Sequence, residues 1–230
     1  MTTLADEAQE WERFAQRNPM WSVLTGNENW DPDEFFNTGD ETVRQLRANL
    51  GDTPGPTALD FGCGVGRLTQ ALATYFERVL GVDASPTMIE QARTFADERL
   101  LKPEAVEFNL IAPDPDALAG LTYDLWISEI TLQHIEEPHQ YRYIEQLCRG
   151  LRDGGQAVFH VMLRPAKPPT YPQRRAEPLM EIHGVDLTVV RRAVERAGCR
   201  LRDLRYHEAQ SSWSDVWTGV WVYTEKRVTV

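Results

Sequence analysis

Three glycines alternate directly after an apolar run, since Gly62, Gly64 and Gly66 follow Asp60 in the stretch Asp-Phe-Gly-Cys-Gly-Val-Gly. Glycine permits a tight turn, a close approach of a ligand to the backbone, and close packing of a helix on a strand. The unpaired N–H groups where a helix begins favour an anionic group. The run therefore predicts a cradle for a nucleoside-containing ligand with an anionic end, although a purely structural strand-to-helix turn would use the same glycines.

A second apolar run, residues 78–83, ends in an acid, Asp83. Ligand contacts in an open α/β sheet lie at the carboxyl ends of the strands, so we expect Asp83 to accept hydrogen bonds from both hydroxyls of a ribose. Ala84 follows, and then a serine and a proline that are typical of a helix N-cap and first helical position. Met88 is a candidate contact for an adenine ring, although packing in the core explains it more simply.

The spacing D-x-G-x-G-x-G differs from the G-x-G-x-x-G of dinucleotide-binding proteins. It resembles the class I S-adenosylmethionine (SAM) methyltransferases, and the resemblance extends over residues 40–225. It implies that Asp60 lies beside the methionine part of SAM and that the glycines pass under the sulfonium and the ribose. It also implies SAM as the cofactor, S-adenosylhomocysteine as the product, and no metal.

Residues 123–135 resemble the family's motif after the fourth strand. The resemblance implies that Ser128 and Glu129 border the methionine end of SAM, and that Gln133 and His134 lie near the acceptor.

The adenine is expected at the loop 111–118, where the family shows an acid followed by small or apolar residues. We assign Asp116 to the adenine amino group and the amide of Ala117 to a ring nitrogen. The alternative reading is a proline-rich turn with solvated acids.

Two histidines are candidate general bases, because imidazole titrates close to physiological pH and can accept a proton from a hydroxyl nucleophile. His134 is the first, and His183 is the second. A packed histidine that braces the glycine loop is the competing interpretation of His134.

Three aromatic-rich segments are candidates for binding the acceptor. They lie before the glycine run, in a proline-rich loop after the fifth predicted strand, and near the carboxyl end. Loops at the carboxyl edge of an α/β sheet hold substrate contacts, so the acceptor is expected to be small and largely apolar or aromatic. The substrate-binding candidates from these segments are Trp21, Trp30, Phe36, Tyr171, Arg174 and Trp213, together with Gln133.

Strand-like runs alternate with helical patterns and predict a doubly wound α/β sheet. The expected strands are 57–61, 78–83, 105–110, 123–128 and 156–162, followed by an antiparallel terminal pair at 200–207 and 217–224. This agrees with the family's Rossmann-like plan of seven mostly parallel strands whose last strand is antiparallel. Two helices are expected before the glycine run. In the first, Leu4, Ala8, Trp11 and Phe14 recur at helical spacing and predict one apolar face, and the second begins at a capping box at Thr38.

We divide the chain into an N-terminal helical and aromatic lid, 1–39, and a SAM-binding domain, 40–230, with a substrate loop at about 164–185. The 230 residues and 42% hydrophobic content suffice for one core. A net charge of −11 argues against nucleic acid or an anionic membrane as the main partner.

Cys63, Cys148 and Cys199 are widely spaced, which suggests neither a disulfide framework nor a metal knuckle. The sequence lacks an export signal and a long apolar run, so we expect a cytoplasmic protein.

The sequence therefore predicts a SAM-dependent methyltransferase that modifies oxygen, nitrogen or carbon of a small-molecule acceptor by in-line displacement, mainly through proximity. Two other functions stay open. One is a peptide or protein methyltransferase acting, for example, on a carboxylate. The other is a SAM-binding member of the fold that does not methylate.

Overall fold

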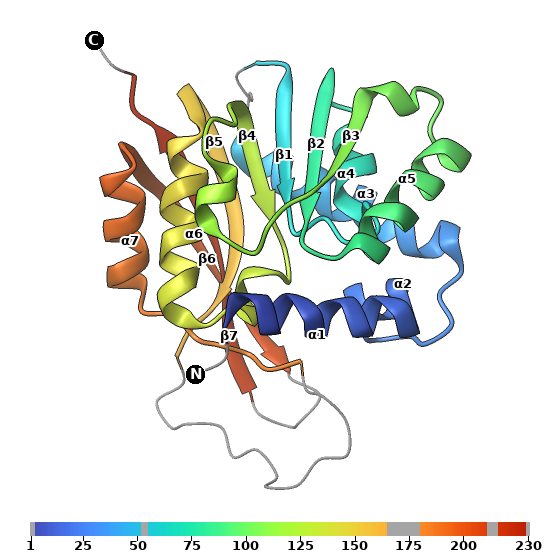
Figure 1. The fold of residues 1–230 in the computed structure, drawn as a ribbon. Coiled ribbons are helices and arrows are strands. Elements are labelled where there is room, and N and C mark those ends of the chain that lie inside the picture. The colour runs from blue at the N-terminus through green and yellow to red at the C-terminus, as the bar shows by residue number, and fades with distance from the viewer. Residues whose placement is uncertain (1–2, 52–54, 165–179, 211–215, 229–230) are drawn as a thin grey trace, which may run out of the picture.

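The computed structural model describes residues 3–51, 55–164, 180–210 and 216–228. A seven-stranded sheet in the order β3-β2-β1-β4-β5-β7-β6 forms its centre (Figure 1). The strands are β1 (Thr57–Phe61), β2 (Arg78–Asp83), β3 (Val106–Leu110), β4 (Tyr123–Ser128), β5 (Leu151–Met162), β6 (Cys199–Gln210) and β7 (Val216–Lys226).

Neighbouring strands are parallel from β3 through β5, whereas β7 pairs antiparallel with both β5 and β6. This confirms the predicted mostly parallel sheet with an antiparallel last strand. The fifth strand starts at Leu151 rather than at residue 156, because Leu151 already pairs with Tyr123 across an irregular stretch of the ladder.

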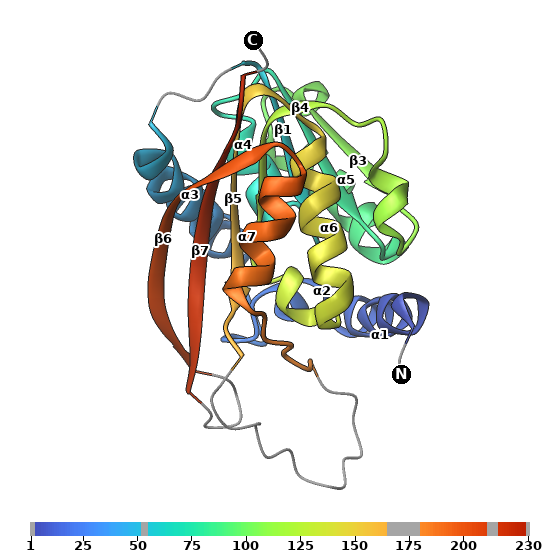
Figure 2. The ribbon, with the colours of Figure 1, turned by 90° about the vertical axis from the view of Figure 1, so that its left-hand side faces the viewer.

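The helices are α1 (Leu4–Arg17), α2 (Pro19–Val23), α3 (Pro32–Leu50), α4 (Arg67–Leu72), α5 (Pro86–Arg99), α6 (Glu137–Arg149) and α7 (Leu187–Arg196), with 3-10 turns η1 (Pro103–Ala105), η2 (Pro115–Leu118) and η3 (Leu132–His134). Figure 2 shows α6 and α7 on one face of the sheet and α3 and α4 on the other. Side chains alternate across a strand, so Leu59 and Phe61 of β1 pack with α6 while Ala58 packs with α3 and α4.

Helix α3 begins earlier than the capping box at Thr38 predicts. The Asp31 carboxylate accepts hydrogen bonds from the amides of Asp33 and Glu34, and Pro32 occupies the first turn. Thr38 lies inside the helix, where its hydroxyl donates to the carbonyl of Phe35. Aspartate followed by proline is a strong start signal, and the helix continues through Thr38 once it has begun. The predicted domain boundary at residue 39 therefore falls within α3.

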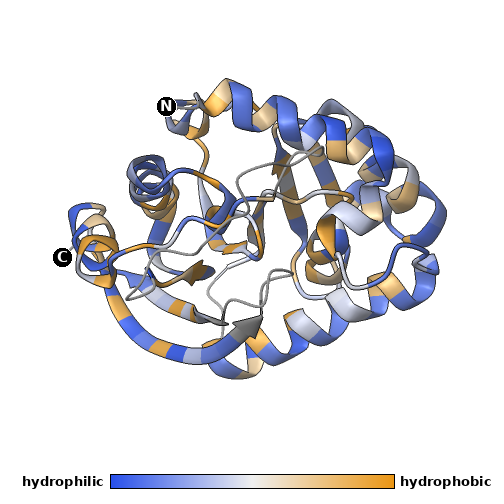
Figure 3. Cartoon of the chain, turned by 90° about the horizontal axis from the view of Figure 1, so that it is seen from below, coloured by the Kyte–Doolittle hydropathy of each residue, from blue (hydrophilic) through white to orange (hydrophobic). Residues whose placement is uncertain are grey.

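Helix α1 crosses the carboxyl ends of the parallel strands, from the side of α6 to the side of α5 (Figure 1). Its first turn is fixed by a capping box, in which Thr3 and Asp6 exchange hydrogen bonds. Figure 3 looks at this end of the molecule and shows hydrophilic and hydrophobic residues interspersed along α1. Such a helix covers protein with one side and faces solvent with the other. Among the described helices, none has the length and apolar character needed to cross a lipid bilayer.

Candidate active site

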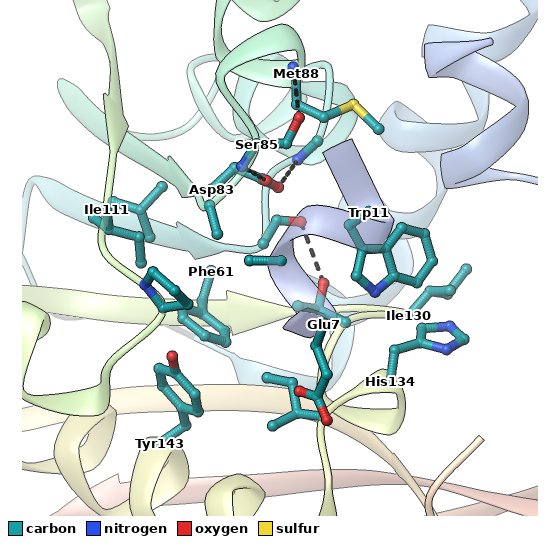
Figure 4. Close-up of a pocket in the computed structure, with 18 of the residues that line it drawn as sticks. Glu7, Trp11, Phe61, Asp83, Ser85, Met88, Ile111, Ile130, His134 and Tyr143 are labelled. Carbon is teal, nitrogen blue, oxygen red and sulfur yellow. Dashed lines mark hydrogen bonds between the residues drawn. The ribbon is translucent and has the colours of Figure 1, made fainter. Parts of the chain in front are cut away.

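A cavity of about 140 Å³ lies at the carboxyl ends of the parallel strands, directly under α1. Its walls come from the glycine loop after β1, the end of β2, the residues after β3 and β4, and one side of α1. Figure 4 shows side chains from these separate elements turned toward one space. A pocket at this edge of the sheet is where an α/β fold places its ligands.

The glycine loop approaches its neighbours so closely that side chains are excluded. Gly62 and Gly64 both have positive φ, at 71° and 53°. A Cβ on Gly62 would lie 2.2 Å from the Cγ2 of Thr131, and a Cβ on Gly64 would lie 2.7 Å from the Cγ2 of Val23. The amides of Gly62 and Cys63 also donate to the carbonyl of Val82, at 2.9 and 3.0 Å. The loop is therefore held against β2 with its backbone exposed to the cavity.

Asp83 turns its carboxylate toward this loop. One oxygen accepts a hydrogen bond from the amide of Gly64 at 2.9 Å, and the other accepts one from the amide of Ser85 at 2.9 Å. Burial raises the pKa of the Asp83 carboxyl, while these backbone hydrogen bonds oppose the rise. Each carboxylate oxygen has a further lone pair, so the group remains able to accept hydrogen bonds from a ligand.

Directly after the carboxyl end of β4, Glu129 lines the cavity and forms an ion pair with the buried Arg67. Arg67 also lies within 3.3 Å of the Thr38 hydroxyl and so connects α4 with α3. The ion pair fixes the Glu129 side chain at the cavity wall.

Helix α1 is attached to both ends of the cavity. The Glu12 carboxylate accepts hydrogen bonds from the hydroxyls of Ser85 and Thr87, at 2.5 and 2.6 Å, beside Asp83. Glu7, more than a turn earlier, accepts a hydrogen bond from the amide of Glu136 at 3.2 Å, beside the start of α6. Between them Trp11 packs edge-on against the His134 ring, with centroids 4.9 Å apart.

Residues 58–155, which contain the glycine loop, Asp83 and β4, match a family described as a methyltransferase domain. A trans-aconitate 2-methyltransferase of Rhodopseudomonas palustris (strain BisB5) is 31% identical over 133 residues, covering 55% of this chain and 47% of that protein. The chain thus spans about half the length of this curated relative.

The chain has the fold of the class I SAM-dependent methyltransferases, and its residues 58–155 match the methyltransferase-domain family.

Solved structures of low identity share the whole fold of this chain. The magnesium protoporphyrin IX methyltransferase of Synechocystis PCC 6803 with bound SAH has a TM-score of 0.67 at 18% identity, covering 95% of this chain and 97% of that one. The cyclase SpnF has a TM-score of 0.69 at 17% identity, covering 97% of both chains. These likenesses concern the fold, which by itself does not fix the reaction.

The predicted cofactor residues of this chain divide into two groups. Those that line the cavity are Gly62, Gly64, Asp83, Ala84, Met88 and Glu129. Those outside its lining are Asp60, Gly66, Asp116, Ala117 and Ser128.

Asp60 lies beneath the glycine loop, on the side of the sheet that faces α4. It is 2% exposed and accepts a hydrogen bond from the Thr69 hydroxyl at 2.7 Å. Burial raises the pKa of this carboxyl to about 7. Ser128 is also buried, and its hydroxyl donates to the carbonyl of Phe61, which ties β4 to β1. Both residues support the loop from below.

The loop after β3 meets the cavity at a different register from the one predicted. Ile111, Ala112 and Pro113 line the cavity. Asp116 lies in the turn η2, where its amide donates to Asp114 and its carboxylate lies 3.7 Å from Arg142. The apolar residues next to β3, rather than Asp116 and Ala117, therefore line the cavity.

His134 lines the cavity, but both of its ring nitrogens are engaged. Nδ1 lies 2.8 Å from the carbonyl of Glu181 and therefore carries the proton, and Nε2 accepts a hydrogen bond from the Gln133 amide at 3.1 Å. Burial lowers the pKa of His134 to about 4. Together with the Trp11 contact, this geometry favours the bracing interpretation of His134.

The second histidine candidate, His183, contacts the residues around His134 through its backbone. Its amide donates to the carbonyl of Gln133 at 2.7 Å, and its carbonyl accepts from the Gln140 side chain at 3.0 Å. Neither His183 nor Gln133 lines the cavity.

The aromatic residues assigned to the acceptor belong to the packing of the N-terminal helices. Trp30 donates to the carbonyl of Leu24 and packs on Phe35, and Phe36 is 3% exposed between Phe35 and α5. Trp21 packs on Phe14. The remaining candidates, Tyr171, Arg174 and Trp213, lie outside the described residues.

The cavity is also lined by residues that were not predicted to do so, among them Glu7, Trp11 and Tyr143. Trp11 belongs to the apolar face of α1 that helical spacing already predicts, but that spacing cannot name the surface against which the face docks. The sequence around Glu7 and Tyr143 does not predict that they line a cavity, because their position there depends on the docking of α1 beside α6.

Proposed function

We propose that this protein transfers a methyl group from SAM to a small-molecule acceptor that is largely apolar or aromatic. The observation that carries the proposal is the placement of Asp83 beside a side-chain-free glycine loop at the edge of an otherwise mainly apolar cavity. A ribose offers two hydroxyls to such a carboxylate, whereas the adjoining backbone leaves space for the sulfonium end.

The residues present fit this cofactor. A Cβ on Gly62 or Gly64 would project into occupied space, so the loop can remain open to a ligand only with glycine. Met88, Ala112 and Pro113 offer an apolar surface for the adenine, and Asp83 accepts from the ribose. Gly62, Gly64 and Glu129 would border the methionine end.

When bound, SAM supplies a methyl group that is already activated on sulfur. The acceptor atom attacks the methyl carbon in line with the carbon–sulfur bond, and that bond breaks to leave S-adenosylhomocysteine. The chain's part is to hold the acceptor in line, and α1 covers the cavity and excludes water. His134 stabilises the η3 turn, at the cavity wall beside Trp11.

The names of the two methyltransferases support a small-molecule acceptor. Trans-aconitate and magnesium protoporphyrin IX are the compounds that these names give. For the present chain we infer the coarser class from the cavity, a pocket that α1 partly covers and that has room for a small ligand.

Calorimetric titration with SAM, S-adenosylhomocysteine and NAD tests the cofactor. We expect both adenosyl ligands to bind and NAD not to bind. Asp83→Ala is expected to weaken S-adenosylhomocysteine by about tenfold, the loss associated with hydrogen bonds to a charged group. The exposed Asp97→Ala on α5 is the matched control and should bind as the wild type does.

A non-methylating reaction is the second candidate, favoured by the full-length likeness to a cyclase. Incubation with acceptor mixtures separates the two functions. Formation of S-adenosylhomocysteine that depends on an added acceptor supports methyl transfer. Conversion of a compound in the mixture with SAM left intact supports the second function.

A further inference from the structure

Glu7 lies at the end of the cavity away from Asp83, the residue proposed to bind the ribose. Helix α1 spans the cavity, with Glu12 attached beside Asp83 and Glu7 attached at Glu136. Figure 4 shows the Glu7 side chain turned into the cavity, with Tyr143 on one side and His134 on the other. The His134 ring in turn bonds to Glu181, at the end of the predicted substrate loop. Glu7 therefore borders the side from which an acceptor would approach.

The two carboxylate oxygens of Glu7 differ in their surroundings. Oε1 accepts the hydrogen bond from the amide of Glu136. Oε2 is buried and has no hydrogen-bond partner among the described residues. An unpaired buried carboxylate oxygen is unfavourable, and a ligand that donates a hydrogen bond there would remove the penalty.

The charges around Glu7 have one sign. Burial, followed by repulsion from Glu136, Glu10 and Glu181, raises the pKa of Glu7 to about 7, against the hydrogen bond from Glu136. The cavity also contains Asp83 and Glu129, of which Glu129 is paired with Arg67, and none of its described lining residues is lysine or arginine. A cationic group of a ligand would be attracted to this end of the cavity and an anionic one repelled.

We propose that Glu7 is a specificity-determining residue that binds an amino group of the methyl acceptor, so that the acceptor is an apolar or aromatic amine. The inference rests on the proposed methyl-transfer function. An ammonium group supplies both the hydrogen-bond donor that Oε2 lacks and the positive charge that the surrounding acids favour. The apolar part of the amine would contact Tyr143 and Ile135, which line the same end.

The test uses full-length protein saturated with S-adenosylhomocysteine, so that the cofactor site is filled before any acceptor is added. Failure to bind S-adenosylhomocysteine would contradict the proposed function itself. With that binding established, calorimetry compares three probes of matched shape: tyramine, 4-(2-hydroxyethyl)phenol and 3-(4-hydroxyphenyl)propanoate. The corresponding phenyl compounds without the ring hydroxyl form a second set.

We expect each amine to bind at least about tenfold more tightly than its alcohol, as for a charge-assisted hydrogen bond, and the carboxylate to bind most weakly. Glu7→Gln keeps the shape of the side chain and should abolish the preference for the amine while leaving S-adenosylhomocysteine affinity unchanged. Glu98→Gln, exposed on α5, is the control and should keep the preference.

A second measurement does not depend on a variant. The carboxyl carbon of Glu7, followed by NMR in the wild type, should titrate near pH 7 and shift to a lower pKa when the amine is added. Equal binding of amine and alcohol, binding of neither, or a preference that survives Glu7→Gln overturns the proposal.

Discussion

Glu12 and Ser85 are joined by a hydrogen bond of 2.5 Å, although 73 residues separate them in the chain. The contact attaches α1 to the N-cap of α5, two residues from Asp83. Burial alone would raise the pKa of Glu12, but the hydrogen bonds from Ser85 and Thr87 outweigh it and lower that pKa. Glu12 is therefore ionised at neutral pH and holds the cover of the cavity in place.

Glu12→Ala should loosen α1 over the cavity. Removing hydrogen bonds worth roughly 1 kcal/mol each is expected to speed the release of S-adenosylhomocysteine several-fold, up to about tenfold. Stopped-flow displacement of the ligand measures this rate. Glu98→Ala on the outer face of α5 provides the comparison, and identical release rates for both variants would show that Glu12 does not retain the cover.

Gly64→Ala should reduce cofactor affinity by more than about tenfold. The new Cβ would lie 2.7 Å from the Cγ2 of Val23 and would require a φ of 53°, which side chains rarely adopt. Either the loop or α2 must then move. Gly26→Ala is the matched control, because nothing lies within 4 Å of its Cβ position. Calorimetry with S-adenosylhomocysteine decides, and equal affinities for the two variants would contradict the prediction.

Asp60→Asn should stabilise the protein at high pH relative to the wild type. Burial raises the pKa of Asp60 from 3.8 to about 7, so the folded state favours the neutral acid. The contribution of Asp60 to stability is therefore greatest at low pH and declines as the pH rises from about 4 to 7. Asparagine has no charge to bury and retains an acceptor for Thr69.

Urea unfolding at pH 5 and pH 8 checks this sign. The free energy of unfolding of Asp60→Asn, relative to the wild type, should be more favourable at pH 8 than at pH 5. A difference that does not change with pH would mean that Asp60 titrates near its ordinary value.

His134 should remain neutral, with its proton on Nδ1, from pH 8 down to about pH 5. Burial lowers its pKa from 6.5 to about 4, so protonation favours the unfolded chain. The stability that neutral His134 contributes is complete above pH 6.5 and is lost as the pH falls toward 4. Nitrogen-15 NMR of the ring reports both tautomer and pKa. Titration near pH 6.5 would restore His134 as a candidate general base.

Asp60 and Asp83 show which features of the site the sequence predicts and which it does not. Asp60 and Asp83 both follow apolar runs, and both were assigned to the cofactor. Alternation along β1 turns Asp60 toward α4, where it is buried and accepts a hydrogen bond from Thr69, whereas Asp83 ends β2 and lines the cavity. A strand pattern identifies such acids, but the direction of each side chain depends on which face the neighbouring helices cover.

In the N-terminal segment, the sequence predicts a helix correctly but does not predict which aromatic residue reaches the cavity. Helical spacing identifies the apolar face of α1, yet Trp21, Trp30 and Phe36 were more conspicuous and were assigned to the acceptor. Those described aromatics pack among helices, and Trp11 reaches the cavity instead. Helix α1 docks on strand ends that lie more than forty residues further along the chain, and no local sequence pattern predicts such a contact. Aromatic content alone therefore does not predict which residues line the cavity.

The docking of α1 also has a consequence during synthesis. The apolar side chains of α1 cover residues from Phe61 to Tyr143, all of which leave the ribosome later than α1 does. A free amphipathic helix of 14 residues is marginal in water. Until the chain has grown past α6, α1 lacks the surface that buries Leu4 and Trp11, and these apolar side chains stay exposed on the nascent protein, where they favour aggregation.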